Sequence, residues 1–232
     1  MPKNPTAQPK PWVFVLSIVA AVLVIAVIVG LVINGSPSKT DHIAEGKEVT
    51  ETQLKSEVKD GVVTLTSDKT DKKAKEVTLY EDFSCSYCAK LAQATDDNMK
   101  KAIEDGDLIV HVAGLNFLDR GEAGHSTKSL AAALEAAQED ADQYWTLRSF
   151  LLENIEDVHD TWDTTLPESL QNMGIDSKIT DAAKNNTEDA NSKAEKNTEE
   201  IKKVSEVQTP TLIHDGKSID TSATWVEDLI KG

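Results

Sequence analysis

The sequence predicts an α/β domain preceded by one transmembrane helix. Three observations support this fold class: an uncharged apolar run near the N-terminus, an alternation of strand and helix patterns after about residue 59, and a single pair of cysteines where a predicted strand meets a predicted helix. The chain has 232 residues, so the part after the apolar run is long enough to bury a hydrophobic core.

The apolar run extends over 22 residues from Trp12 to Ile33 and contains no charge. A helix of that length measures roughly 33 Å, which suffices for a hydrocarbon core of about 30 Å. A cleaved signal peptide has a shorter apolar region, of about 7–15 residues, followed by a small-residue cleavage site. We therefore predict an uncleaved membrane anchor over residues 12–33.

The charges around this run predict its orientation. Lys3 and Lys10 are the only charged residues before it, so the positive-inside rule keeps residues 1–11 in the cytoplasm as a short tail. The rest of the chain then lies outside, with 22 basic and 40 acidic residues and a net charge of −18. This charge disfavours nucleic acid as a partner and is typical of a solvated acidic surface.

Residues 34–58 are polar and begin with Gly35, Ser36, Pro37 and Ser38, which predicts an extracytoplasmic linker with a short helix at most. The domain predicted over residues 59–232 starts with Asp60-Gly61 and a strand at 62–66. A charged turn leads to a second strand at 76–80.

A helix follows the cysteines, because Leu91, Ala92, Met99 and Ile103 share one face at a 3.6-residue period. Asp105-Gly106-Asp107 ends this helix, and residues 108–112 read as a third strand. The order of strand, helix and strand predicts a right-handed parallel crossover.

Residues from about 120 to 205 show helical patterns throughout. Apolar residues at 130–134 and at 144–151 predict two helices, and Thr165 with Glu168 has the spacing of a capping box at the start of another.

Strand patterns return near the C-terminus. Residues 211–214 and 217–219 predict two strands, and Asp215-Gly216 between them is a two-residue hairpin signal. An amphipathic helix over 222–230 completes the predicted domain.

Cys85 and Cys88 predict redox chemistry. A disulfide between them closes a loop too short to add more than roughly 2 kcal/mol of stability. A structural zinc site needs four ligands, and the histidines of this chain lack paired ligand spacing. At a helix start, unpaired N–H groups lower the pKa of Cys85 and make it the nucleophile, while Cys88 lies one turn inside and resolves the mixed disulfide.

The strand, the Asp-Phe-x-Cys-x-x-Cys motif at 82–88, the helix and the late Thr209-Pro210 resemble the DsbA-like members of the thioredoxin superfamily. The resemblance implies a thioredoxin-like fold with a helical insertion at about 120–205. It also implies that Thr209 and Pro210 form a cis-proline loop, which lies beside the cysteines and pairs its backbone with a substrate peptide. No cofactor and no metal are implied.

The residues around the cysteines depart from the best-known relatives. Ser86 and Tyr87 replace the Pro-His of the strong oxidant and the Gly-Pro of thioredoxin, so a strongly oxidising character does not follow from the resemblance. Both residues are expected to contact the substrate. Glu81 and Asp82 are candidates for the acidic group that family members keep beneath the pair for proton transfer, although strand-end carboxylates are commonly solvated.

The sequence therefore predicts a single-pass membrane protein with an extracytoplasmic thiol-disulfide oxidoreductase domain. The favoured prediction for this domain is a monomeric oxidase. Its substrates are expected to be exported proteins that contain cysteine. The resemblance implies reoxidation by a membrane partner, either DsbB-like or vitamin K epoxide reductase-like. Two alternatives stay open: an anchored thiol reductase of the cytochrome-maturation type, and a peptide-binding or chaperone module without redox activity.

Overall fold

The structure is a computed structural model that describes residues 39–119 and 123–232. The predicted tail at 1–11, the predicted anchor at 12–33 and the first part of the predicted linker, 34–38, lie outside the described residues. None of the helices in the described part combines the length and the apolar character that a membrane crossing requires.

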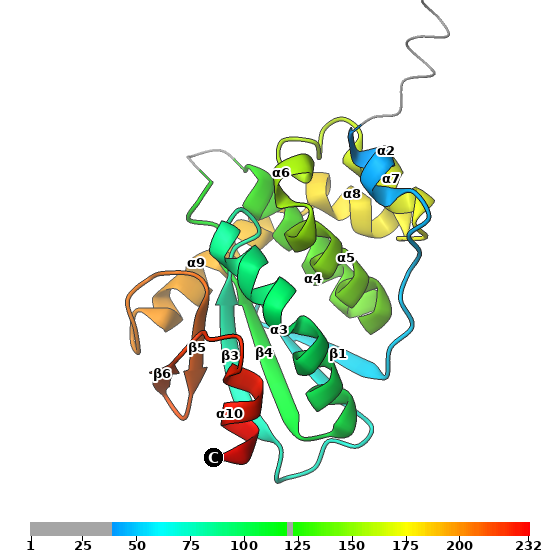
Figure 1. The fold of residues 1–232 in the computed structure, drawn as a ribbon. Coiled ribbons are helices and arrows are strands. Elements are labelled where there is room, and N and C mark those ends of the chain that lie inside the picture. Colours follow the sequence, from blue (N-terminus) through cyan, green and yellow to red (C-terminus); the bar gives the residue numbers. More distant parts are fainter. Residues whose placement is uncertain (1–38, 120–122) are drawn as a thin grey trace, which may run out of the picture. The chain divides into compact units, whose positions relative to one another are not determined.

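The described strands form one six-stranded sheet in the order β1-β2-β4-β3-β5-β6 (Figure 1). β3 and β4 are parallel and the other neighbours are antiparallel, so the parallel pairing of the predicted crossover is confirmed. The strands are β1 (Leu54–Lys59), β2 (Val62–Ser67), β3 (Lys75–Glu81), β4 (Leu108–Gly114), β5 (Thr211–His214) and β6 (Lys217–Ile219).

A helical insertion between β4 and β5 confirms the α/β domain of the predicted fold class. Its helices gather to one side of the sheet, except α9, which packs on β4 (Figure 1). They are α4 (His125–Glu139), α5 (Ala141–Glu153), α6 (Ile155–Val158), α7 (Leu166–Asn172), α8 (Ser177–Asn185) and α9 (Thr187–Ile201). Thr165 directly precedes α7, as the predicted capping box requires. The capping hydrogen bond itself is wrong, because the Thr165 side chain accepts from no N–H group of α7.

The sheet separates two hydrophobic cores, because successive side chains of a strand point to opposite faces. Val77 and Leu79 of β3 join the larger core, with α3 (Ser86–Asp105), α10 (Trp225–Lys231) and the insertion. Tyr80 joins the smaller core on the other face, with Ile201 of α9. Both cysteines lie in the larger core, which therefore positions the pair.

The linker predicted over residues 34–58 is wrong from residue 39 onward, because the compact unit begins at Lys39. Helix α2 (Lys39–Ala44) packs against α6 and α7, and β1 pairs with β2 along the edge of the sheet. The turn between β1 and β2 is Asp60-Gly61, with φ of 51° and 85°, the same left-handed pair as Asp215-Gly216 at 49° and 72°. The Asp60-Gly61 turn therefore indicates the N-terminal hairpin in the sequence, although the first strand of this hairpin has only Leu54 and Val58 as apolar residues.

Candidate active site

Cys85 lies at the junction of β3 and α3. It is the residue before the first helical residue, and its extended backbone donates an N–H hydrogen bond to Asp82 O at 2.9 Å. Its own carbonyl accepts from Ala89 N at 3.1 Å, which starts the helix. Cys88 follows one turn inside, and both residues are free thiols and buried. The pair thus sits at the positive end of a 20-residue helix, as predicted.

The surroundings of Cys85 lower its pKa to about 5. The Cys88 side chain contributes most by hydrogen bonding to the Cys85 sulfur, and burial opposes this effect. The Thr209 side chain and the backbone N–H groups of Cys88 and Tyr87 add smaller stabilisation. Cys85 is therefore a thiolate near neutral pH, when it is reduced.

The surroundings of Cys88 act in the opposite direction. Burial raises its pKa far above the ordinary value, and the negative charges of Cys85 and Glu81 raise it further. At neutral pH the reduced pair therefore holds one proton on Cys88 and one negative charge on Cys85. This inequality supports the predicted division between a nucleophile and a buried second thiol.

The structure brings Thr209 and Pro210 to Cys85 from 124 residues further along the chain. The Thr209-Pro210 peptide bond is cis, and Cys85 Sγ lies 3.3 Å from Thr209 O. A groove of about 270 Å³ opens beside this contact. Its lining residues come from α3 and from two late loops: Tyr87, Lys90, Leu91, Ala94, Thr209, Pro210, Thr221 and Ala223.

Ser86 and Tyr87 are exposed and lie on different sides of the helix start. Tyr87 has 68% of its surface exposed and lines the groove at Pro210, with Lys90 Nζ 5.2 Å from its ring centroid. Ser86 instead lines a larger cleft between α3 and the helical insertion. The structure therefore places only Tyr87 of the two beside Thr209 and Pro210.

Glu81 is buried and forms an ion pair with a buried arginine. Arg148 of α5 donates to Glu81 Oε1 at 2.8 Å and to Glu81 Oε2 at 2.7 Å, and its third contact is Asp96 Oδ2 of α3 at 2.7 Å. The solvated alternative for Glu81 is thus wrong. The bidentate geometry holds Glu81 in place, and its charge is one of the causes that raise the pKa of Cys88.

Asp82 is also buried, and its hydrogen bonds join the loop at Ser84, the segment after β4 and the first turn of α4. Its carboxylate accepts from Ser126 Oγ at 2.5 Å, from Ser84 N at 2.8 Å and from Leu118 N at 3.3 Å. Burial outweighs these contacts and raises the pKa of Asp82 to about 6. Asp82 is therefore a carboxyl group that can exchange a proton near neutral pH.

Arg148 was not predicted, although the sequence carries a signal for it. It lies on the same helix face as Tyr144 and Leu151, where a lone charged residue in an apolar stripe indicates a buried partner. The identity of that partner is not legible from the sequence, because Glu81 is 67 residues away.

Among the described residues, no group of three or more histidine, cysteine, aspartate or glutamate side chains is arranged to hold a metal ion.

Comparison with known proteins agrees with this geometry. The sequence model of a family described as thioredoxin matches residues 70–230. A comparison with curated protein sequences gives no match.

Solved structures give closer matches. The chain is similar to the MdbA protein of Corynebacterium matruchotii, a thiol-disulfide oxidoreductase, with 35% identity and a TM-score of 0.74 over 82% of this chain and 98% of that one. MdbA of Corynebacterium diphtheriae also has 35% identity, with a TM-score of 0.73 over 81% and 98% of the two chains. DsbA of Mycobacterium tuberculosis shares the fold, with 21% identity and a TM-score of 0.58 over 74% and 93%.

Proposed function

The chain belongs to the thioredoxin family and is a DsbA-like thiol-disulfide oxidoreductase, and on that premise we propose that it is an oxidase anchored in the cell membrane with its catalytic domain outside the cytoplasm. Its substrates are exported proteins that contain cysteine. The observation that carries the oxidising direction is the low pKa of Cys85, about 5. A stabilised thiolate favours the reduced form of the enzyme and so makes the oxidised form a stronger oxidant.

The proposed reaction starts from a disulfide between Cys85 and Cys88. A substrate thiolate attacks the Cys85 sulfur, a new disulfide joins substrate and enzyme, and Cys88 leaves as a thiolate that takes up a proton. A second substrate thiolate then attacks the substrate sulfur of this mixed disulfide and releases Cys85. The low pKa of Cys85 makes it a good leaving group in that second step. The substrate is oxidised by two electrons, and the enzyme pair is reduced.

The groove beside Pro210 is the proposed place for the substrate peptide. Thr209 and Pro210 offer backbone groups next to Cys85, and Tyr87 offers an exposed aromatic surface along the same groove. Ser86 would contact the substrate on the other side of the helix start. Asp82 is the proposed proton carrier for the pair, and Glu81 contributes a fixed charge.

The reduced enzyme needs a reoxidising partner, which we propose is a DsbB-like or vitamin K epoxide reductase-like membrane protein. The uncharged run at 12–33 supports the anchor, and Lys3 and Lys10 support a cytoplasmic position for residues 1–11. The domain is proposed to act as a monomer.

Trapping of mixed disulfides in intact cells tests the oxidase function. The Cys88→Ala variant retains the nucleophile but cannot release a bound substrate through Cys88, so it should accumulate mixed disulfides with several exported proteins. The double variant Cys85→Ala/Cys88→Ala is the matched control and should trap none. Capture of a single cytochrome-maturation client would contradict oxidation and favour the reductase alternative. Peptide binding that survives in the double variant without any trapped client would favour the chaperone alternative.

A further inference from the structure

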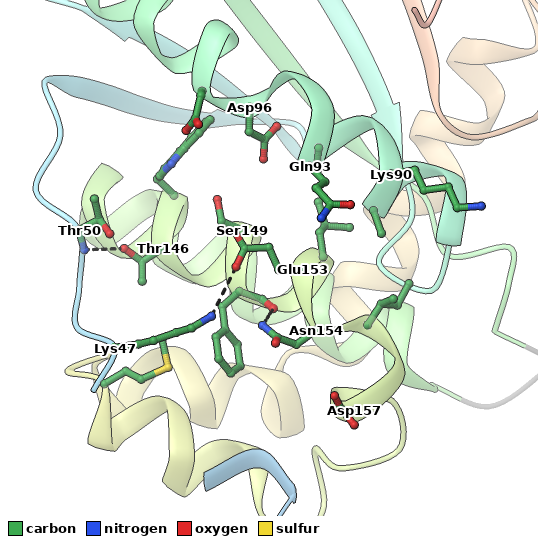
Figure 2. A pocket seen from close by; sticks show the side chains of 18 of the residues that line it. Lys47, Thr50, Lys90, Gln93, Asp96, Thr146, Ser149, Glu153, Asn154 and Asp157 are labelled. Carbon is green, nitrogen blue, oxygen red and sulfur yellow. Dashed lines mark hydrogen bonds and ion pairs between the residues drawn. The ribbon is translucent and has the colours of Figure 1, made fainter. Parts of the chain in front are cut away.

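A second, larger recess lies on the other side of the helix start from the groove at Pro210. It is a cleft of about 990 Å³ between α3 and the helices α5 and α6 of the insertion, with residues 47–50 at one end (Figure 2). This volume is at the upper end of the range in which proteins bind ligands, about 300–1,000 Å³. The reaction described above does not use this cleft.

The cleft and the groove lie on two sides of the start of α3, next to Cys85. Ser86, directly after Cys85, lines the cleft, whereas Tyr87 lines the groove. Lys90 lines both, but its side chain extends away from the cleft (Figure 2) and lies over the Tyr87 ring. A chain that crosses the end of α3, about 10–12 Å wide, needs about three to four extended residues. A substrate segment seated at Pro210 can therefore continue over Ser86 into the cleft.

The lining of the cleft suits a polypeptide with long side chains. Buried apolar groups of Trp145, Phe150 and Met173 contribute to it. Gln93 and Ser149 add polar side chains to the lining (Figure 2), and these can hydrogen-bond an extended backbone. Apolar surface with a few convergent polar groups is the usual composition of a binding site.

The charges of the lining favour a cation. Six carboxylates and three lysines line the cleft; the carboxylates are Glu48, Asp96, Asp97, Glu153, Glu156 and Asp157. Asp96 is paired with buried Arg148, which it shares with Glu81, and Glu153 lies 3.4 Å from Lys47 Nζ. The other four carboxylates form no ion pair with the described part of the chain. Glu153 also ends α5, and the negative end of a helix attracts positive charge.

We propose that this cleft binds the segment of a client protein that flanks the reacting cysteine, and that it selects segments with lysine or arginine. This inference rests on the proposed function, because it assumes that a client chain is held at Cys85. The long stem of a basic side chain packs on the apolar surface, and its charged head reaches the carboxylates of α6. The cleft thereby ranks clients by the sequence next to their cysteines.

Oxidation rates of short peptides test the proposal with the full-length oxidised enzyme. Each peptide carries two cysteines and, three to six residues from one of them, either two arginines or two glutamines. Separate peptides place these two residues on the N-terminal side or on the C-terminal side of that cysteine. We expect the arginine peptide to react about three- to tenfold faster than the glutamine peptide for one of the two placements, at low salt. This size corresponds to one or two exposed ion pairs of about 0.2–1 kcal/mol each.

The double variant Glu156→Gln/Asp157→Asn should reduce this ratio toward one. The control Asp181→Asn/Glu188→Gln removes one aspartate and one glutamate charge from the exposed surface of α8 and α9, outside the cleft, and should keep the ratio. If the double variant fails to fold, Asp97→Asn on the opposite wall replaces it. A ratio of one in the wild type, or an equal fall in both double variants, contradicts the cleft as the source of selection. Failure of the wild type to exchange thiols even with glutathione contradicts the proposed function instead.

Discussion

Cys85 and Cys88 differ because α3 places one sulfur at its positive end and the other inside the core. The hydrogen bond between the two side chains connects their pKa values: it stabilises the thiolate of Cys85 and keeps the proton on Cys88. Reactivity at this pair is thus a property of the helix start and of its buried neighbours. Two predictions at the scale of single residues follow from these contacts.

The first concerns the source of the low pKa of Cys85. Replacement of Cys88 by alanine removes the largest stabilising contact and should raise the pKa of Cys85, whereas Cys88→Ser keeps a hydroxyl donor and should raise it less. The ultraviolet absorption of the thiolate, titrated in the reduced proteins, measures both values against a wild-type midpoint at about pH 5. Equal midpoints in all three proteins would show that backbone N–H groups alone set the pKa.

The second concerns Arg148, which is buried between Glu81 and Asp96. Arg148→Met should lower the free energy of unfolding by about 3–5 kcal/mol, because it leaves buried Glu81 and partly buried Asp96 without their cation. Urea unfolding measures the loss. Lys203→Met, which removes an exposed lysine paired with Glu200, is the control and should change little. A small loss in Arg148→Met would mean that water reaches Glu81.

At the scale of elements, Asp82 fastens the start of α3 to two other segments. Its backbone and carboxylate bond the loop at Ser84 and Cys85, its side chain accepts from Leu118 after β4, and Ser126 joins it from the first turn of α4. The loop that presents Cys85 is thus held by one buried carboxyl group. Because that group has a raised pKa, its contribution depends on pH.

The pKa of Asp82 rises from 3.8 to about 6 on folding. Between about pH 4 and pH 6, the folded protein therefore keeps a proton on Asp82, whereas the unfolded chain has released it. Stability from this group therefore falls as the pH rises through that window, by about 2–3 kcal/mol. Asp82→Asn should gain stability relative to the wild type across the same window. Denaturant unfolding at a series of pH values measures the difference, with Asp181→Asn as the control for loss of one charge. A difference that is constant from pH 4 to pH 6 would contradict the raised pKa.

The elements that sequence patterns predicted are those with strong periodicity or a distinctive turn. Buried β3 and β4, amphipathic α3 and the Asp215-Gly216 hairpin were legible, because local residues determine them. β1 was missed, because an edge strand needs an apolar residue only on its inner face, and its pattern is Leu54 and Val58 alone. Arg148, Glu81 and Asp96 come from three separate elements, so their contact follows only from the tertiary fold.

The packing of β1 gives a prediction for this missed strand. Leu54 is buried in the larger core, so Leu54→Ala should cost about 2–3 kcal/mol of stability through lost burial and the cavity left behind. Glu57→Ala on the exposed side of the same strand should cost far less and serves as the matched control. Equal effects in thermal or urea unfolding would indicate that β1 behaves as the predicted linker.

At the scale of the whole molecule, the compact unit from Lys39 onward carries the redox pair, and the 38 residues before it contain the proposed membrane anchor. The unit has a net charge of −18, which keeps it soluble and repels it from anionic lipid surfaces. If the domain works at a membrane as proposed, its attachment would therefore depend on the apolar run rather than on surface attraction. This dependence can be measured directly.

The full chain should sediment with membranes and resist extraction at alkaline pH, whereas a chain that begins at Lys39 should be found in the soluble fraction. In intact cells, the proposed orientation predicts that a membrane-impermeant thiol reagent labels reduced Cys85. It also predicts that a matched probe, Asn4→Cys in the variant without Cys85 and Cys88, is labelled only after the membrane is opened, because the positive-inside rule would keep a tail with Lys3 and Lys10 in the cytoplasm. The reverse labelling pattern would contradict the proposed orientation, and recovery of a mature chain shortened past residue 33 would contradict the uncleaved anchor while leaving the catalytic site intact.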